Sequence, residues 1–447
     1  MGQHPSKGSD PATDEFLSRG PGTGKTHTVT NILALLAMME DKPLRIGLAA
    51  PTGKAAARLG ESLRAAWRNL PKGCPALLPE NPRTLHRLLG VSPDSVRFRH
   101  HRDNPLLFDL LILDEASMID LPLMAALLDA LLPQTRLIIL GDRNQLASVE
   151  AGRLFADLCG SDTPGWSAPL REKLAALTEL PPAGGDARGL RDSVVMLHKS
   201  YRFKDNSGIG RLVEAVKQNK PEDMEEILDG DFADLKLLEG SEAQFDHELT
   251  RLILDGFLSC FQARSPREGL EQYNRFRILC ALRDGPRGVT GLTGRVESLL
   301  RRHKLIPPAG IFNYRGRPIM ILRNHYGLRL FNGDTGIIWP DEKNRLQAWF
   351  MREDGEPVPI SPARLPQHDT AYAVTVHKSQ GSEFDHVLLM LPQEDNRLVS
   401  RELLYTGISR AKHQLSLRAE RPILRTALAR RTRRYSGLAE KLGVRSG

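Results

Sequence analysis

The chain has 447 residues, a formal net charge of +8 and 40% hydrophobic residues, values typical of a globular protein with about three domains. Its longest apolar run, residues 32–39, is far shorter than the roughly 18 residues that cross a membrane. The four cysteines lack the spacing of metal ligands or of a disulfide framework, which argues against both and favours a reducing cytoplasm. The positive charge permits an anionic partner such as nucleic acid but does not by itself indicate one.

Short apolar runs alternate with helical patterns along most of the chain. Residues 1–14 are small, polar and turn-forming, and 1–18 are expected to form a leader that is either disordered or foreign to the fold. A helix is expected over 26–39, and strands are expected over 46–50, 110–113 and 137–140, each followed by a helical stretch. This βαβ pattern predicts a parallel sheet for a first domain, 19–192, which ends in a linker rich in Gly and Pro.

A second α/β domain is expected over 193–447. Strands are predicted at 276–282 and 387–391, again in the pattern of a parallel sheet. Between them, at 305–365, short β-prone runs separated by Gly and Pro predict a small all-β insertion. The fold class is therefore α/β, with two parallel-sheet domains and a β insertion in the second. The Arg-rich segment 421–447 is interpreted as a solvated amphipathic helix.

A phosphate-binding loop is predicted at 20–26, GPGTGKT, directly before the first helix. Its glycines allow backbone N–H groups to face phosphate oxygens, Lys25 can reach the β- and γ-phosphates, and the Thr26 hydroxyl can ligate Mg²⁺. A glycine-rich turn that merely caps the helix is the alternative interpretation. Two features depart from the pattern, because Arg19 stands where a first glycine is expected and no buried strand is evident before the loop.

Two further strand ends are expected to add polar groups to the same edge of the sheet. The apolar run 110–113 is followed directly by Asp114 and Glu115. Asp114 would hold Mg²⁺, directly or through water, and Glu115 would orient or deprotonate the attacking water. After the strand 137–140, the amide of Gln145 can hydrogen-bond the γ-phosphate or the attacking water. Acidic residues at the start of a helix are the alternative for the carboxylate pair, which the upstream loop disfavours.

Nine blocks of sequence follow one another in a recognisable order, namely GPGTGKT (20–26), LAAPTGKAAARL (48–59), TLHRLLG (84–90), LLILDEASMIDLP (110–122), LGDRNQLASVEAG (140–152), LHKSYRF (197–203), LFNGDTG (330–336), TVHKSQGSEF (375–384) and LYTGISRAK (404–412). These blocks resemble superfamily 1 DNA helicases, and more closely the RecD family, the alpha subunits of exodeoxyribonuclease V (RecBCD). The resemblance implies two RecA-like domains with nucleotide between them and an SH3-like insertion. It also implies ATP-driven 5′-to-3′ translocation along single-stranded DNA.

The resemblance implies a role for each matched residue. The nucleotide site would comprise Gly20, Gly22, Thr23, Gly24, Lys25, Thr26, Asp114, Glu115 and Gln145. Arg202 and Arg410 match arginines that reach the γ-phosphate, and Glu383 matches a residue that contacts the ribose. Contacts to DNA are implied for Thr52, Lys54, Thr84, His86, Thr375, His377, Lys378 and Ser379. Asn332 and Phe331 are further candidates for DNA, with a turn asparagine and a core phenylalanine as equal alternatives.

ATP and Mg²⁺ are the implied cofactors, and single-stranded DNA with a 5′ end and RecB- and RecC-like subunits are the implied partners in the cytoplasm. The leading function is an ATP-dependent helicase subunit that acts in recombinational double-strand break repair. The family's domain and strand before the phosphate loop are not recognised, so we expect an N-terminal truncation whose first 19 residues are not native to the fold. The alternative function is a catalytically impaired subunit that binds DNA or partners without efficient ATP turnover.

Overall fold

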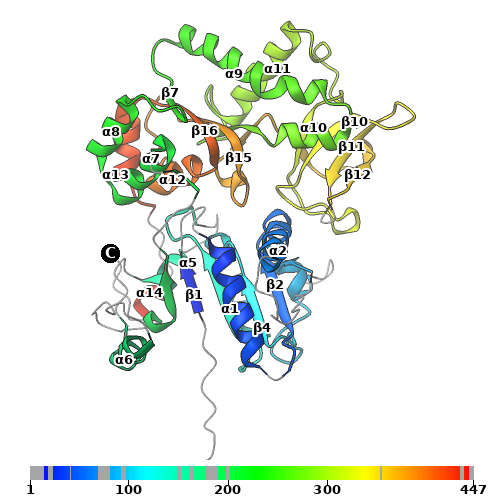
Figure 1. The fold of residues 1–447 in the computed structure, drawn as a ribbon. Helices are drawn as coiled ribbons and strands as arrows, with labels where there is room; N and C mark the ends of the chain where they lie inside the picture. Colours follow the sequence, from blue (N-terminus) through cyan, green and yellow to red (C-terminus); the bar gives the residue numbers. More distant parts are fainter. Residues whose placement is uncertain are drawn as a thin grey trace, which may run out of the picture. The chain divides into compact units, whose positions relative to one another are not determined.

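The chain folds into two compact units, shown in the computed structural model of Figure 1. The structure describes residues 15–18, 24–40, 42–68, 81–91, 97–147, 153–160, 166–177, 190–197, 202–204, 206–352, 355–432 and 437–441. The first unit comprises Met1–Arg143, Ala147–Ser200 and Arg434–Gly447, and the second comprises Asn144–Leu146 and Tyr201–Arg433. Among the described residues, no helix has the length and apolar character needed to cross a membrane.

The first unit is built on a parallel sheet that is buried on both faces. In its described residues the strands are β1 (Glu15–Ser18), β2 (Ile46–Ala50), β3 (Arg83–Thr84), β4 (Leu110–Leu113), β5 (Arg136–Gly141) and β6 (Val194–Met196), in the order β3-β2-β4-β5-β1-β6. Along β4, Leu111 and Leu113 enter one apolar cluster while Leu110 and Ile112 enter another. Side chains of a strand alternate between faces, so these clusters lie on opposite faces of the sheet.

Helices connect the strands of the first unit and supply its two outer layers. They are α1 (Lys25–Met39), α2 (Gly53–Trp67), α3 (Leu85–Leu89), α4 (Leu121–Ala130), α5 (Leu154–Cys159) and α6 (Ala168–Leu177), with short 3₁₀ turns η1 (Ala116–Met118) and η2 (Arg191–Ser193). The predicted strands 46–50 and 110–113 are confirmed, and the strand predicted at 137–140 extends over Arg136–Gly141. The short helix α14 (Leu438–Lys441) also belongs here, since Leu438 packs against this core.

The expectation of a disordered leader over 1–18 is wrong for its last four residues, which form β1; that the leader is foreign to the fold stays a prediction. This strand lies between two parallel partners, with Glu15 opposite Ile138 of β5 and Phe16 opposite Val194 of β6. The expectation that no strand precedes the phosphate loop is therefore also wrong. A run of two apolar residues gives too weak a signal to predict a strand, whereas two neighbouring strands supply backbone partners on both of its edges.

The second unit contains another parallel sheet, again with helical connections. Its described strands are β7 (Leu235–Leu237), β8 (Phe276–Cys280), β14 (Ala373–Thr375), β15 (Phe384–Met390) and β16 (Ala411–Arg418), in the order β14-β8-β15-β16-β7. The helices are α7 (Gly208–Gln218), α8 (Pro221–Asp229), α9 (Glu242–Gln262), α10 (Pro266–Tyr273), α11 (Val289–Arg302), α12 (Arg401–Ile408) and α13 (Arg421–Ala429). The predicted strands at 276–282 and 387–391 are found as β8 and β15. Within the described part of 421–447, the predicted helix is found as α13 and α14.

The predicted β insertion lies between α11 and β14. It is an antiparallel sheet of β9 (Pro318–Ile321), β10 (Thr335–Pro340), β11 (Leu346–Met351), β12 (Pro357–Ile360) and β13 (His368–Thr370), with the turns η3 (Tyr326–Leu328) and η4 (Pro362–Arg364). One face forms a small core of its own around Ile319 and Phe350. On the other side Trp339 packs with Leu270 of α10, so the insertion is joined to the second unit by apolar contacts as well as by its chain ends.

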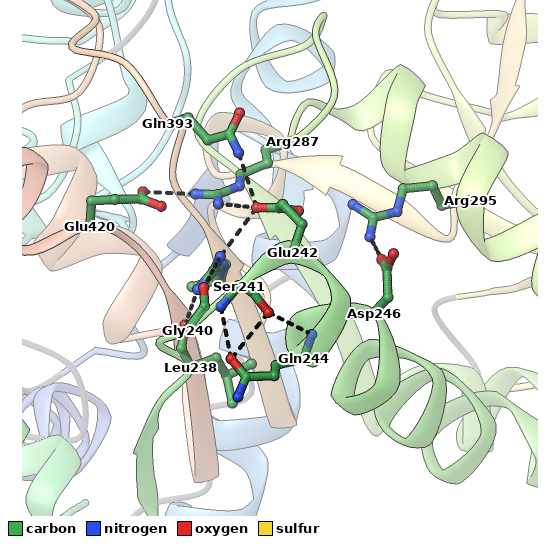
Figure 2. A network of polar contacts seen from close by, with 11 residues as sticks. Leu238, Gly240, Ser241, Glu242, Gln244, Asp246, Arg287, Arg295, Gln393 and Glu420 are labelled. Carbon is green, nitrogen blue, oxygen red and sulfur yellow. Dashed lines mark hydrogen bonds and ion pairs between the residues drawn. The ribbon is translucent and has the colours of Figure 1, made fainter.

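An ionic network fixes the loops that follow three parallel strands of the second unit (Figure 2). Arg287 follows β8, Gln393 follows β15, and Arg418 is the last residue of β16. All three donate to the same oxygen of Glu242, at 2.6, 3.0 and 3.2 Å respectively. Glu242 begins α9, whose first turn carries a capping box between Ser241 and Gln244. The carboxyl edge of this part of the sheet is therefore closed by side chains.

Candidate functional site

The amino end of α1 has the geometry of an anion-binding helix terminus. Gly24 precedes the helix in a left-handed conformation with φ 79°, and no side chain caps the first turn within the described residues. The Gly24 carbonyl accepts from both the N–H (2.9 Å) and the hydroxyl (3.2 Å) of Thr28. The remaining N–H groups of the first turn and the helix dipole favour a negative ligand. The predicted loop residues Gly20, Gly22 and Thr23 lie outside the described residues, as does the Thr26 side chain.

Asp114 and Glu115 lie at the end of the buried strand β4, as predicted from the sequence. The Asp114 N–H donates to the Ala49 carbonyl of β2 at 2.9 Å, and the Glu115 N–H donates to Oδ1 of Asp114 at 2.8 Å. Burial raises the pKa of Asp114, and the positive charge of Lys25 opposes that rise. The predicted phosphate-binding lysine is therefore close enough to Asp114 for its charge to affect the carboxyl group.

Glu115 carries its carboxylate on a strained backbone. Its φ of 53° and ψ of 39° place it in the left-handed region, which costs a residue with a Cβ about 1 kcal/mol or more. One of its carboxylate oxygens, Oε2, is buried and has no hydrogen-bond partner among the described residues. The Ser117 hydroxyl is in the same situation. A buried carboxylate oxygen that receives no hydrogen bond can bind a cation or a water molecule. Carboxylate and water oxygens are the ligands that Mg²⁺ prefers.

The two predicted arginines, Arg202 and Arg410, both contact Ser409 in the second unit. Arg202 forms an ion pair with Glu383 and donates to the Ser409 carbonyl at 3.0 Å. Arg410 is 2% exposed and donates to the carbonyls of Thr406 and Ser382, each at 3.2 Å. The three residues assigned to the nucleotide by resemblance thus lie together on this unit. Their guanidinium groups are oriented by main-chain carbonyls rather than by loose surface contacts.

Gln145 leaves the first unit's sheet just after β5 and is 5% exposed. The residue after it is held by the second unit, where the Leu146 N–H donates to the Thr406 hydroxyl at 2.9 Å and the Gln380 amide donates to the Leu146 carbonyl at 2.7 Å. The residue next to the predicted γ-phosphate sensor is therefore hydrogen-bonded to α12, the helix that ends beside Arg410.

The predicted DNA residues of the first unit lie at two adjacent strand ends. Ala50 of β2 is opposite Thr84 of β3, and Thr52 follows two residues after Ala50. Both threonines cap helices, since Thr52 accepts from Ala55 N–H at 3.2 Å and Thr84 accepts from Arg87 N–H at 3.3 Å. Burial lowers the pKa of His86. Lys54, in the first turn of α2, is exposed.

The predicted DNA residues of the second unit follow β14. Thr375 accepts from the Lys378 N–H at 3.3 Å, which shapes the turn η5 (His377–Ser379). Burial lowers the pKa of the Lys378 ammonium, which lies in the field of Asp369 and Arg283. Ser379 is 1% exposed and its hydroxyl donates to the Val376 carbonyl at 2.7 Å, so we assign that hydroxyl to the turn and not to DNA.

Asn332 and Phe331 lie in the turn that precedes β10. The Phe331 N–H donates to Asp334 and the Asn332 N–H to Asn324, each at 2.8 Å, and Asn332 is exposed while Phe331 is half-buried. This geometry matches a structural turn closely and leaves only Asn332 open to a ligand.

Comparison with known proteins identifies the family. An AAA domain model matches residues 11–151, and a UvrD-like helicase C-terminal domain model matches residues 370–417. The RecBCD enzyme subunit RecD of Haemophilus influenzae is 38% identical, over 96% of this chain and 70% of that protein. The RecD subunit of Mycolicibacterium smegmatis is 39% identical, over 95% of this chain and 72% of that protein. The chain belongs to the RecD family. A solved structure of Pif1 helicase from Candida albicans is more distant, with 15% identity and a TM-score of 0.44 over 97% of this chain and 95% of that one.

For this RecD-family chain, sequence reasoning missed two charged residues beside Lys378. Arg283 follows β8 and forms an ion pair of 3.2 Å with Asp369, the residue in the middle of β13. The charges of both residues affect the pKa of the Lys378 ammonium group. The Gly- and Pro-containing loop after a buried strand, LRDGPRG at 282–288, was the available signal, since such loops carry ligand contacts at the carboxyl ends of parallel strands.

Proposed function

We propose that this chain is an ATP-driven helicase subunit of an exodeoxyribonuclease V complex, which moves 5′ to 3′ along single-stranded DNA in recombinational double-strand break repair. The observation that carries the proposal is the buried Asp114 in the field of Lys25, with Glu115 directly beside it, in a RecD-family chain. RecB- and RecC-like subunits are its proposed partners, in the cytoplasm.

The residues of the first unit would bind and activate the nucleotide. The open start of α1 and the Lys25 ammonium neutralise the phosphate charge. Asp114 and the Thr26 hydroxyl would hold magnesium, which supplies further positive charge to the phosphates when it is bound. Glu115, with its unpaired oxygen, would orient the attacking water and accept its proton.

The residues of the second unit would complete charge stabilisation. Phosphoryl transfer accumulates negative charge on the γ-phosphoryl oxygens, so fixed cations there accelerate it. Arg202 and Arg410 are the proposed donors, and Glu383 would contact the ribose while it orients Arg202. Gln145 would report an intact γ-phosphate to α12 through the bonds made by its neighbour Leu146.

Single-stranded DNA would bind through its backbone at the ends of β2, β3 and β14. Hydroxyl, imidazole and ammonium groups contact phosphate and sugar without reading sequence, as a translocating motor requires. The proposed contacts are Thr52, Lys54, Thr84, His86, Asn332, Thr375, His377 and Lys378. Affinity should fall steeply with added salt, because phosphate contacts release counterions.

The alternative is a subunit that binds DNA or partners but turns over ATP poorly. It rested partly on the absence of a strand before the phosphate loop, and β1 removes that argument. What continues to favour it is Arg19 at the first loop position, which lies outside the described residues.

The deciding experiment is ATP hydrolysis by the purified chain with and without oligo-dT. We expect stimulation by single-stranded DNA, and a loss of about 100-fold or more in Lys25→Ala, the scale of removing one preorganised donor. Lys42→Ala, an exposed lysine just after α1, is the matched control and should hydrolyse ATP normally. A wild-type chain that binds DNA without hydrolysis would support the alternative, and Arg19→Gly should then restore turnover.

A further inference from the structure

The segment that leads from α11 into the β insertion has an unusual composition. Residues 301–317, RRHKLIPPAGIFNYRGR, contain five Lys or Arg residues, one His and no Asp or Glu. Within the described residues, the side chains of Arg302 and Lys304 are exposed and form no ion pair. Arg301 is paired with Glu297 at 3.0 Å and Arg317 is buried. The exposed basic charge of the segment therefore comes mainly from Arg302 and Lys304, and such charge attracts an anionic polymer such as the phosphate backbone of nucleic acid.

Two large apolar side chains project from the middle of this basic segment. Ile311 is 52% exposed and Phe312 is 77% exposed, and Phe312 is the most exposed aromatic residue in the part of the chain that the structure describes. Neither side chain belongs to any of the apolar clusters of the fold. Exposed apolar residues that stabilise nothing within the chain are typical of contact surfaces.

The tip that carries them is held firmly at both ends. On one side Ile306 is buried in the core of the second unit. On the other, the buried Tyr314 hydroxyl hydrogen-bonds the Tyr372 hydroxyl at 3.1 Å. Gly316, with φ +85°, packs so closely on Phe261 that a Cβ there would lie 2.6 Å from its ring. Pro307 and Pro308 restrict the chain between these anchors, so little conformational entropy is lost when the tip binds a ligand.

The anchors also place the tip near the proposed DNA segment. The Ala371 N–H donates to the Pro318 carbonyl at 3.0 Å, and its own carbonyl accepts from the Tyr273 hydroxyl at 2.5 Å and from Arg277 at 3.2 Å. Tyr372, which holds the tip, precedes Thr375 by three residues of extended chain, about 10 Å. At about 3.4 Å per nucleotide along one strand, about three stacked nucleotides of DNA span the same length.

We propose that residues 302–312 form a second contact for single-stranded DNA, in which a base stacks on Phe312 while Arg302 and Lys304 bind flanking phosphates. The proposal rests on the proposed function and extends its DNA path beyond η5 toward the insertion. Base–aromatic stacking tolerates every sequence because each base has a π face, which suits a motor. Ile311 would add apolar contact to the edge of the same base.

The test measures binding of fluorescent oligo-dT to the full chain by anisotropy, with a short and a long oligonucleotide of about 6 and 16 nucleotides, the range of single-strand sites. We expect Phe312→Ala to weaken binding of the long oligonucleotide about tenfold and to leave the short one unchanged. Phe312→Trp should retain affinity, and Phe312→Leu should lose it, since leucine keeps the apolar surface without a π face. The double variant Arg302→Gln/Lys304→Gln should reduce the salt dependence of the long oligonucleotide.

Leu398→Ala is the matched control, because Leu398 is also an exposed apolar loop residue of the second unit, at 55%, but follows the acidic residues Glu394 and Asp395. Equal affinities of wild type and Phe312→Ala for both oligonucleotides would overturn the inference. If Phe312→Ala and Phe312→Leu instead bind both oligonucleotides like wild type and lose only the retention of a partner subunit, the tip is a protein contact. The inference is then also wrong. The proposed function is tested separately, by asking whether the short oligonucleotide stimulates ATP hydrolysis by the wild-type chain. A failure of the proposed function can therefore be told apart from a failure of the inference about Phe312.

Discussion

Glu115 shows how a single residue can carry both strain and chemistry. Its left-handed backbone turns the chain at the end of β4, so that Asp114 and Glu115 both leave the strand at the same edge. Adjacent side chains on a regular strand would point to opposite faces. The sequence predicted the identity of both carboxylates, but their convergence depends on a backbone conformation that no residue pattern around Glu115 indicates.

The strain makes stability and activity respond in opposite directions to one substitution. In Glu115→Gly we expect the first unit to gain about 1 kcal/mol in free energy of unfolding, because glycine adopts positive φ without steric cost and the buried unpaired oxygen is removed. ATP hydrolysis should fall about 100-fold or more, the contribution of a positioned general base. Urea denaturation and steady-state hydrolysis measure the two effects.

Two variants separate these causes. Glu115→Gln keeps the strain and should lose hydrolysis without a gain in stability. Asn219→Gly relieves a similar backbone, φ 58°, at the end of α7 in the second unit, and should leave hydrolysis unchanged. If Glu115→Gly hydrolysed ATP at the wild-type rate, Glu115 would have no catalytic role.

At the scale of elements, long and strongly patterned segments were the predictable ones. The apolar runs of β2, β4 and β8 are buried in full, and the sequence located each within two residues. What the pattern did not reveal was the pairing between distant elements, since the partners of an ion pair are set by topology. The three donors of Glu242 come from positions 287, 393 and 418, far apart in the chain.

Helix α9 carries a second acidic residue whose charge links stability to pH. Glu248 accepts from Arg251 at 2.8 Å and from Lys236 of β7 at 2.7 Å, and these bonds lower its pKa to about 2. A carboxyl whose pKa is lowered by folding stabilises the native state above its unfolded pKa, near 4.5, and this contribution is lost as pH falls toward 2.

We therefore expect Glu248→Gln to lower the unfolding free energy of the second unit by about 1 kcal/mol at pH 7, a value reduced by solvent screening. The difference from wild type should shrink between pH 4.5 and pH 2. Urea denaturation at several pH values measures it. Glu271→Gln, an exposed glutamate on α10, is the control and should give the same small effect at every pH. A Glu248→Gln deficit that persisted at pH 2 would show that the lost contact is packing and not charge.

At the scale of the whole molecule, the α/β class and the two parallel sheets follow from the alternation of apolar runs and helices. Membership of the second unit was harder to predict. Residues 144–146 belong to it although they follow a strand of the first unit, and Arg434–Gly447 belongs to the first although α13 precedes it. These assignments depend on which core a few side chains enter, as Leu146 and Leu438 illustrate. No local pattern encodes such a choice.

Because each unit has its own core, disruption of a strand in one unit should destabilise that unit and not the other. β1 pairs on both edges, with β5 and β6, so proline at Leu17 removes a ladder hydrogen bond inside the sheet. The buried group left unpaired should destabilise the first unit by about 1–3 kcal/mol. Hydrogen exchange of β4 and β5 should accelerate, while that of β8 and β15 should not. Leu388→Pro in β15, which lies between β8 and β16, is the reciprocal control and should affect only the second unit. If Leu17→Pro left exchange in β4 and β5 unchanged, residues 15–18 would contribute nothing to the stability of the first unit and would behave as a leader after all.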